Sequence, residues 1–255
     1  MICRHQSNGQ TLDVAGLNQI TVLIDRSETE LTEVGINSWH PGLDGPPHAH
    51  TGKEQNFFVT AGRGEVVIGG ESFPAAPGDL FYVPAGVVHQ TINRGTDRLT
   101  YFLFNAFLDA SKEGHASFAD HISKVKETRR QQAEQQRAEA DADLTHRPAP
   151  TRRGKKIALP ATGGTGVVLL ARTETERCEA LAWQLADSGR AVIAAEPAKE
   201  QTLFVVAGTG SVQIGNEQAA VHQGHTLLVP RGTACVLTAG PAGLHVVSFG
   251  TVVVR

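Results

Sequence analysis

Three histidines carry the clearest chemical signal in this 255-residue sequence. His48 and His50 are separated by one residue, and His89 comes shortly after the Pro-x-Gly turn at 84–86. Side chains two positions apart on a strand point to the same side, because successive residues alternate faces. Neutral imidazole is a suitable ligand for zinc, iron, nickel and similar divalent metals. The spacing therefore predicts a divalent-metal site assembled from one strand and a following turn.

The segments that must position these histidines have the character of β-strands. They are short, rich in β-branched or aromatic residues, and mostly bounded by Gly, Pro, Asn or Asp. The predicted strands include residues 19–24, 57–59, 65–68, 80–83, 202–206, 211–214 and 226–229. Many short strands at this spacing are typical of an all-β sandwich or jelly-roll barrel.

The sequence also repeats itself at a constant offset of 146 residues. The segment that begins at Arg26 (RSETE) recurs from Arg172 (RTETE), and the triplet Lys53-Glu54-Gln55 recurs as Lys199-Glu200-Gln201. Turn residues recur at the same offset: Gly62/Gly208, Gly64/Gly210, Gly69/Gly215, Gly78/Gly224, Pro84/Pro230 and Gly86/Gly232. Because the same turns are made twice, the chain is predicted to contain two copies of one domain.

A polar connector separates the two copies. Helical spacing relates Phe118, His121, Ile122 and Val125. Residues 127–140 contain strong helix formers but almost no apolar face, and residues 147–156 are predicted to be an extended, basic linker. We therefore expect barrels at 1–110 and 159–255, joined by a partly helical polar linker at 111–158.

Composition excludes several classes of function. A formal net charge of −3 gives no electrostatic basis for binding nucleic acid, and no apolar run is long enough to span a bilayer. Cys3, Cys178 and Cys235 are too scattered for a disulfide framework or a CxxC site, and the N-terminus lacks a secretory signal. We expect a cytoplasmic protein, monomeric or homodimeric, that acts on a small molecule.

Together these features resemble the cupin superfamily. The second cupin motif, Gly-x5-Pro-x-Gly-x2-His-x3-Asn, is matched without a gap by Gly78, Pro84, Gly86, His89 and Asn93. The first, roughly Gly-x5-His-x-His-x3-4-Glu-x6-Gly, is matched by Gly42, His48, His50 and Gly62. The resemblance implies an all-β bicupin of two jelly-roll barrels with the metal site in the N-terminal barrel. It does not specify the reaction, because this fold hosts many chemistries.

Glu54 and Gln55 compete for the acidic position of the first motif. Glu54 keeps an allowed distance from His50 but lies eight residues before Gly62, whereas Gln55 keeps both motif distances. Neighbouring strand residues face opposite sides, so only one of them reaches the metal unless a bulge intervenes. On register we assign the metal ligands His48, His50, Gln55 and His89, with Glu54 as the alternative.

Both residues of that pair remain candidates for catalysis. Whichever of Glu54 and Gln55 is not a ligand can hydrogen-bond the substrate, but only Glu54 can relay a proton. The competing interpretation is a structural role for Lys53-Glu54-Gln55, because the triplet recurs in the second copy.

The second copy has lost the ligand residues. The 146-residue offset maps His48, His50 and His89 onto Ala194, Glu196 and Cys235. A slip of one or two residues supplies no histidine, because none occurs between His146 and His222. We expect the second copy to be a structural partner of the first.

The resemblance implies a metal-dependent enzyme, first a dioxygenase that uses iron(II), with Mn²⁺, Ni²⁺ or Zn²⁺ as alternatives. An O₂-independent isomerase or lyase and a non-catalytic small-molecule-binding cupin are the other interpretations. The candidate pocket walls are Trp39, Phe57, Phe81 and Tyr82. Surface or core positions are expected for the other histidines: His5, His40, His115, His121, His146, His222, His225 and His245.

Overall fold

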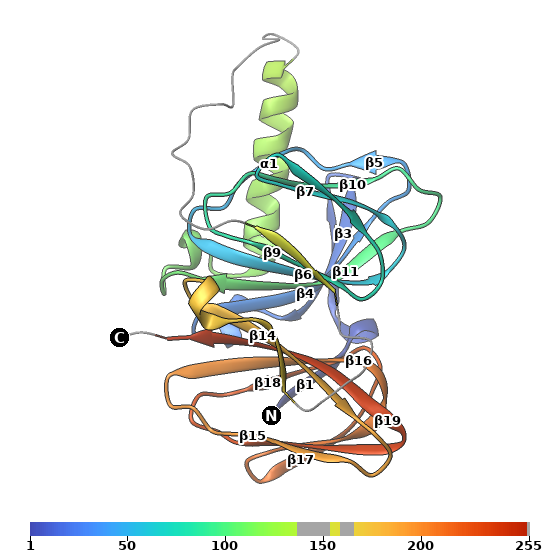
Figure 1. Cartoon of the computed structure of the whole chain (residues 1–255). Helices are drawn as coiled ribbons and strands as arrows, with labels where there is room; N and C mark the ends of the chain where they lie inside the picture. Colours follow the sequence, from blue (N-terminus) through green and yellow to red (C-terminus); the bar gives the residue numbers. More distant parts are fainter. Residues whose placement is uncertain (137–153, 159–165, 254–255) are drawn as a thin grey trace.

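The structure is a computed structural model that describes residues 1–136, 154–158 and 166–253. Most of the described chain is β-strand, as predicted, and the α-helix α1 (Phe118–Gln136) lies in the predicted connector. Figure 1 shows two β-sheet bodies stacked on each other, with α1 rising along one side of the N-terminal body. Residues 137–153 of the predicted linker lie outside the described residues, as do 159–165.

The N-terminal body is built from two sheets that enclose an apolar core. The larger sheet runs in the order β12 (Lys155–Ala158), β9 (Asp79–Val83), β6 (Lys53–Ala61), β11 (Leu99–Phe107), β4 (Thr32–Trp39), β3 (Asn18–Ile24), β2 (Gln10–Val14). The smaller sheet runs β5 (Leu43–Asp44), β10 (His89–Asn93), β7 (Gly64–Ile68), β8 (Glu71–Ala75). Side chains from both, among them Phe57, Phe81 and Val66, pack into one buried cluster.

The C-terminal body is one continuous sheet, because two of its strands are long enough to bend through both layers. Its main order is β1 (Ile2–His5), β18 (His225–Val229), β16 (Lys199–Ile214), β19 (Cys235–Val252), β14 (Cys178–Leu185), β13 (Val167–Leu170). Two more strands pair with β19 and β16 respectively: β15 (Arg190–Ile193) and β17 (Glu217–His222). Four short 3₁₀ turns complete the described elements: η1 (Gln6–Asn8), η2 (Arg26–Glu28), η3 (Lys112–Gly114) and η4 (Arg172–Glu174).

The repeated glycines make the same turns in both bodies. Gly62 and Gly208 have φ values of +78° and +83°, in the left-handed region that favours glycine. A Cβ atom would lie 2.0 Å from the Arg98 carbonyl oxygen at Gly62, and 2.2 Å from that of Gly243 at Gly208. The turn therefore requires glycine twice, for the same steric reason.

The strand pairing crosses the predicted domain boundaries. β1 was expected in the N-terminal barrel, but it pairs with β18 of the C-terminal body, from Ile2 opposite Leu228 to His5 opposite His225. β12 was expected in the linker, but it pairs with β9 of the N-terminal body. Figure 1 accordingly places the N-terminus at the C-terminal body. Each body thus gains an edge strand from outside its predicted bounds, β1 from the N-terminal segment and β12 from the linker, an arrangement that sequence periodicity does not reveal.

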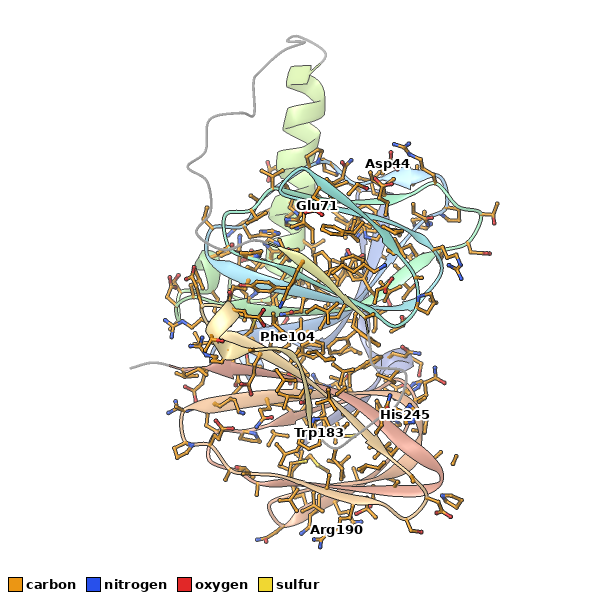
Figure 2. The ribbon with its side chains drawn as sticks, viewed as in Figure 1. Asp44, Glu71, Phe104, Trp183, Arg190 and His245 are labelled. Atoms are coloured by element: carbon orange, nitrogen blue, oxygen red, sulfur yellow. The ribbon has the colours of Figure 1, made fainter. Side chains whose placement is uncertain are left out.

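The two faces of the large N-terminal sheet have different roles. One face packs on the C-terminal body through stacked aromatic rings, with centroid distances of 4.4 Å for Phe102–Phe204 and 5.0 Å for Phe104–Phe249. Phe104 lies between the bodies in Figure 2. The other face turns inward to the N-terminal core. Because successive strand residues alternate faces, each side chain of this sheet points either to the interface with the C-terminal body or to the N-terminal core.

Candidate metal centre

His48, His50 and His89 converge in the N-terminal body. One side-chain nitrogen from each lies within 4.8 Å of the others. Two contacts bring the segments together: His48 and His89 exchange backbone hydrogen bonds of 3.0 and 2.8 Å, and the Gly86 amide donates to the His50 carbonyl at 2.7 Å. The Pro-x-Gly turn thus positions the histidine strand as well as His89. Among the described residues, this is the His, Cys, Asp and Glu group with metal-site geometry.

Backbone carbonyls fix the tautomer of two of the imidazoles. His48 Nδ1 lies 3.0 Å from the Pro46 oxygen, and His89 Nδ1 lies 3.2 Å from the Val87 oxygen. A carbonyl oxygen can only accept, so Nδ1 carries the hydrogen and Nε2 keeps its lone pair. This is the arrangement that orients histidines around metals.

Burial favours the neutral form of two of the three imidazoles. It lowers the pKa of His89 to about 3, and burial, followed by the charge of Lys53, lowers the pKa of His50 well below its usual value. Glu113 Oε1 lies 3.9 Å from His50 Nδ1 and Glu113 Oε2 lies 3.0 Å from Lys53 Nζ, so the carboxylate pairs mainly with the ammonium. Neutral imidazoles are the form that binds metal, so the cluster is ready to coordinate at neutral pH.

Strand register separates the two candidates for the fourth ligand. Gln55 and Phe57 lie on the inward face of β6, and the Phe57 ring is 5.8 Å from the His89 ring. Glu54 lies on the opposite face, where its carboxylate accepts hydrogen bonds from the amides of Glu176 and Arg177, each 2.8 Å, and of Cys178, 3.2 Å. Glu54 is thus engaged away from the imidazoles, which corrects its assignment as an alternative ligand or proton relay.

The recurrence of the KEQ triplet has a structural reason. Glu200, the counterpart of Glu54, accepts from the amides of Glu30 and Leu31 at 3.2 Å each and from the Thr32 hydroxyl at 2.8 Å. Both carboxylates are at most 4% exposed. Each copy therefore contributes one buried glutamate that accepts hydrogen bonds from the other copy. The donors are the last residue of the RSETE or RTETE motif and the two residues after it.

The Gln55 amide lines the same cavity as the three imidazoles. Its Nε2 donates to Asn105 Oδ1 at 2.9 Å, whereas its Oε1 is buried without a hydrogen-bond partner. A buried, unsatisfied acceptor costs free energy unless it finds a partner. Three imidazole nitrogens and one such oxygen fit a divalent cation.

The comparisons with known proteins agree with this geometry. Residues 36–105, which include all four candidate ligands, match the Cupin domain family. This segment is a cupin domain. No curated protein matches the chain in sequence.

The likeness to solved cupin structures extends over both bodies. Procruciferin, an 11S globulin from Brassica napus, has 14% identity and a TM-score of 0.70, with 98% of this chain and 83% of that chain covered. An oxalate decarboxylase from Lactobacillus farciminis, solved with formate, has 12% identity and a TM-score of 0.69, with 100% and 87% covered. At these identities the likeness concerns the fold, and it gives the chain a two-domain cupin architecture.

A small cavity surrounds the imidazoles of the cupin domain. Its volume is about 90 Å³, and its walls include Trp39 and Phe57, both predicted as pocket walls. Two further predicted walls are elsewhere: Phe81 packs in the core, and Tyr82 donates its hydroxyl hydrogen to Glu54 at the interface. Phe81 and Tyr82 are neighbours on β9, so their side chains face opposite sides of the sheet. Residue type alone does not indicate which side each of them faces.

Helix α1 closes one side of the cavity and brings a histidine that we expected at the surface or in the core. His121 lines the cavity beside Phe118, Ile122 and Val125, and its ring lies 6.2 Å from that of His50. Burial lowers its pKa, and its Nδ1 has no hydrogen-bond partner. The signal was present in the sequence, since His121 shares the apolar face of the predicted helix.

The second cupin body has no equivalent centre among the residues that the structure describes. Cys235 occupies the position of His89 but pairs with Ile193 in the strand ladder, so His48 corresponds to Ile193 rather than to Ala194. Burial raises the pKa of Cys235 to about 12, so its thiol is protonated. Glu196 keeps the position of His50, because its carbonyl accepts from the Gly232 amide as that of His50 accepts from Gly86, and its side chain is exposed and paired with Lys199. None of these groups can replace the imidazole cluster.

None of the helices in the described residues has the length and apolar character to cross a membrane.

Proposed function

We propose that the N-terminal cupin domain is the single active site of a metal-dependent oxygenase that acts on a small organic substrate. The two bodies are, in this proposal, jelly-roll barrels, of which the second supports the first within one chain. The observation that carries the proposal is the convergence of three imidazoles in a cavity that is also lined by Gln55, whose amide oxygen has no hydrogen-bond partner. Iron(II) is the expected metal, with manganese, nickel and zinc as alternatives.

The charge of the cavity favours an anionic substrate. The described residues that line it include no carboxylate, and the one charged side chain among them is Lys53. A divalent cation held by neutral ligands would keep its full positive charge, so a substrate carboxylate, enolate or catecholate would be attracted electrostatically. The cavity volume of about 90 Å³ favours a small substrate, since pockets for drug-sized ligands measure roughly 300–1,000 Å³.

Each wall of the cavity has a proposed role. His48, His50, His89 and Gln55 would hold the metal, which would supply open positions for substrate and O₂. Trp39 and Phe57 would exclude water from the reacting atoms. His121 faces the cavity from α1 and would hydrogen-bond a substrate oxygen. Asn37 donates to Tyr101 Oη at 3.0 Å, and Trp39 Nε1 donates to the same oxygen at 2.9 Å, which fixes the polar floor.

Two other functions remain as alternatives because cupin neighbours of both kinds exist. The oxalate decarboxylase among the similar structures is an enzyme by its name, whereas procruciferin is a globulin. An O₂-independent isomerase or lyase would use the same metal to polarise a carbonyl. A non-catalytic binding cupin would hold the small molecule without converting it.

Turnover with and without oxygen distinguishes these functions. The purified protein, loaded with Fe²⁺, is assayed with small catechols, diketones, keto sugars and dicarboxylates, and O₂ uptake is followed by electrode. Turnover that requires O₂ supports the oxygenase. Turnover that persists without O₂ supports the isomerase or lyase, and metal binding without conversion of any compound supports a binding protein.

A further inference from the structure

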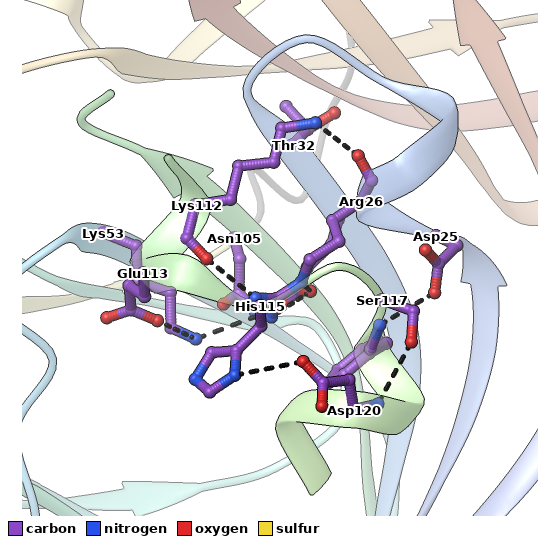
Figure 3. Close-up of polar contacts among 12 residues, drawn as sticks. Asp25, Arg26, Thr32, Lys53, Asn105, Lys112, Glu113, His115, Ser117 and Asp120 are labelled. Carbon is purple, nitrogen blue, oxygen red and sulfur yellow. Dashed lines mark hydrogen bonds and ion pairs between the residues drawn. The ribbon is translucent and has the colours of Figure 1, made fainter. Parts of the chain in front are cut away.

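A buried ion pair lies beneath the candidate metal centre. Arg26 and Glu33 are both fully buried, and Glu33 Oε2 accepts from Arg26 Nε at 2.6 Å and lies 2.5 Å from a second guanidinium nitrogen. Lys53 Nζ lies 3.7 Å from Glu33 Oε1. Glu33 forms an ion pair with Arg26 and lies beside Lys53, so its carboxylate oxygens act as hydrogen-bond acceptors. Arg26 Nη1 also donates to the Lys112 carbonyl oxygen at 2.9 Å (Figure 3).

Asn105 connects this carboxylate to Gln55. Asn105 Nδ2 donates to Glu33 Oε1 at 2.6 Å, and Asn105 Oδ1 accepts from Gln55 Nε2 at 2.9 Å. An ionised carboxylate repels the amide oxygen, so the nitrogen of Asn105 must face Glu33 and its oxygen must face Gln55. The same reasoning turns the Gln55 nitrogen toward Asn105. The Gln55 oxygen is then the end of the chain that has no partner.

The second body provides an internal comparison. It retains the counterparts Glu179, Lys199 and Gln201, but Gly250 lies opposite Glu179 and Gln201 where Asn105 lies opposite Glu33 and Gln55. Lys199 Nζ contacts Glu179 directly at 2.7 Å, and a Cβ atom at Gly250 would lie 2.9 Å from Lys199 Cδ and 3.0 Å from Glu179 Cγ. The bridging amide is therefore present only in the body that carries the imidazoles.

We propose that Glu33 and Asn105 are positioning residues that orient the Gln55 amide so that its oxygen, and not its NH₂ group, faces the metal. The inference rests on the proposed function, in which Gln55 is a metal ligand. A glutamine has no intrinsic preference for presenting either end of its amide. The fixed polarity from Arg26 through Glu33 and Asn105 supplies that preference, as outer hydrogen bonds do around metal ligands generally.

The first test removes the bridge without changing the charge. Asn105→Leu is compared with the wild-type protein in titrations with Co²⁺ alone, followed by visible absorption. We expect Co²⁺ affinity to fall by about 10- to 100-fold, the usual range for loss of an outer partner, with unchanged far-ultraviolet circular dichroism. Glu179→Gln, which alters the counterpart of Glu33 in the second body, is the matched control and should leave Co²⁺ affinity unchanged.

The second test reverses the polarity of the hydrogen-bond chain. In Glu33→Gln the amide oxygen must face Arg26, so its nitrogen faces Asn105, and Gln55 is forced to present NH₂; affinity should fall. Adding Gln55→Glu restores an oxygen ligand that accepts from the reversed Asn105, so the double variant should recover Co²⁺ binding to within a few fold of wild type. Additive effects of the two substitutions, without rescue, would overturn the proposal, because independent sites add.

The outcomes separate the inference from the function on which it rests. Wild-type protein that binds no Co²⁺ would refute the proposed metal centre, and the inference with it. Wild-type binding together with unchanged affinity in Asn105→Leu would refute the inference and leave the metal centre standing. If Asn105→Leu does not fold, the double variant Glu33→Gln/Gln55→Glu tests the inference instead, because it retains Asn105 and the net charge of the protein.

Discussion

The two cupin bodies share their architecture and differ in their interiors. In both, a glycine with positive φ makes the same turn, and an edge strand comes from outside the predicted domain bounds. In both, a buried glutamate accepts hydrogen bonds from backbone amides of the other body. The residues responsible lie on the outer face of the central sheet or at its turns. Inward positions on which the candidate site depends differ: His89 is matched by Cys235, and Asn105 by Gly250. Comparison of the copies therefore separates residues that assemble the fold from residues that build a site.

Lys53-Glu54-Gln55 illustrates how alternation produces this separation within three residues. Glu54 faces the interface in the same way as Glu200, so it belongs to the shared architecture. Gln55 faces inward and lines a cavity with the imidazoles. Among the described residues, Gln201 has Gly250 opposite it in place of the asparagine, and no imidazole cluster corresponds to that of the first body. A triplet that recurs in sequence thus has one shared role and one role specific to its copy.

The strongest test of the comparison converts the first site toward the second. His89→Ala removes an imidazole on which the cluster depends, and we expect stoichiometric metal binding to be lost because two imidazoles and an amide bind divalent metals weakly. Elemental analysis of protein purified without affinity nickel measures the metal content. The matched change in the second body, Cys235→Ser, should leave the metal content unchanged; a loss there would show that the second body takes part in coordination.

The next test affects both bodies equally. Glu54→Gln and Glu200→Gln each weaken a buried carboxylate that accepts three hydrogen bonds across the interface, so each should reduce the free energy of unfolding by about 3 kcal/mol. Urea denaturation measures the loss. Metal content should stay at the wild-type level in both variants, and a selective loss of metal in Glu54→Gln would return Glu54 to the site.

The sequence predicted the β fold, the duplication and the three imidazoles because these depend on local rules. Strand alternation relates His48 to His50, and turn chemistry requires Gly86 near His89. The sequence could not predict the pairing of β1 and β12, because an edge strand pairs equally well with either copy by composition. Asn105 was also missed, although it is the polar member of the inward series Tyr101, Leu103, Asn105, because nothing local indicates which buried carboxylate it meets.

Acid should destabilise the metal-free first body more than the second. The pKa of His89 is lowered to about 3 by burial, against 6.5 when exposed, so between these pH values the unfolded state binds more protons than the folded state. Stability is therefore full above pH 6.5 and decreases as pH falls toward 3, at about 1.4 kcal/mol per pH unit for the fully buried group. His89→Gln should flatten this dependence in urea denaturation series recorded with chelator. His225→Gln, in the second body, removes a less buried imidazole and should change the slope far less. If His89→Gln has the same slope as the wild-type protein, His89 is protonated in the folded protein.

The smallest expected effect concerns α1, a helix that the first body carries and the described part of the second body does not. His121→Leu keeps the apolar packing of α1 but removes the imidazole that faces the cavity, so Co²⁺ affinity should not change. Binding of a small anion such as oxalate to the Co²⁺-loaded protein should weaken by several fold, because one hydrogen bond contributes about 1 kcal/mol. His115→Leu is the control, since His115 contacts His121 but does not line the cavity. A loss of Co²⁺ affinity as large as that of His89→Ala would instead make His121 a ligand, and the difference between the bodies would then extend to a helix outside the repeat.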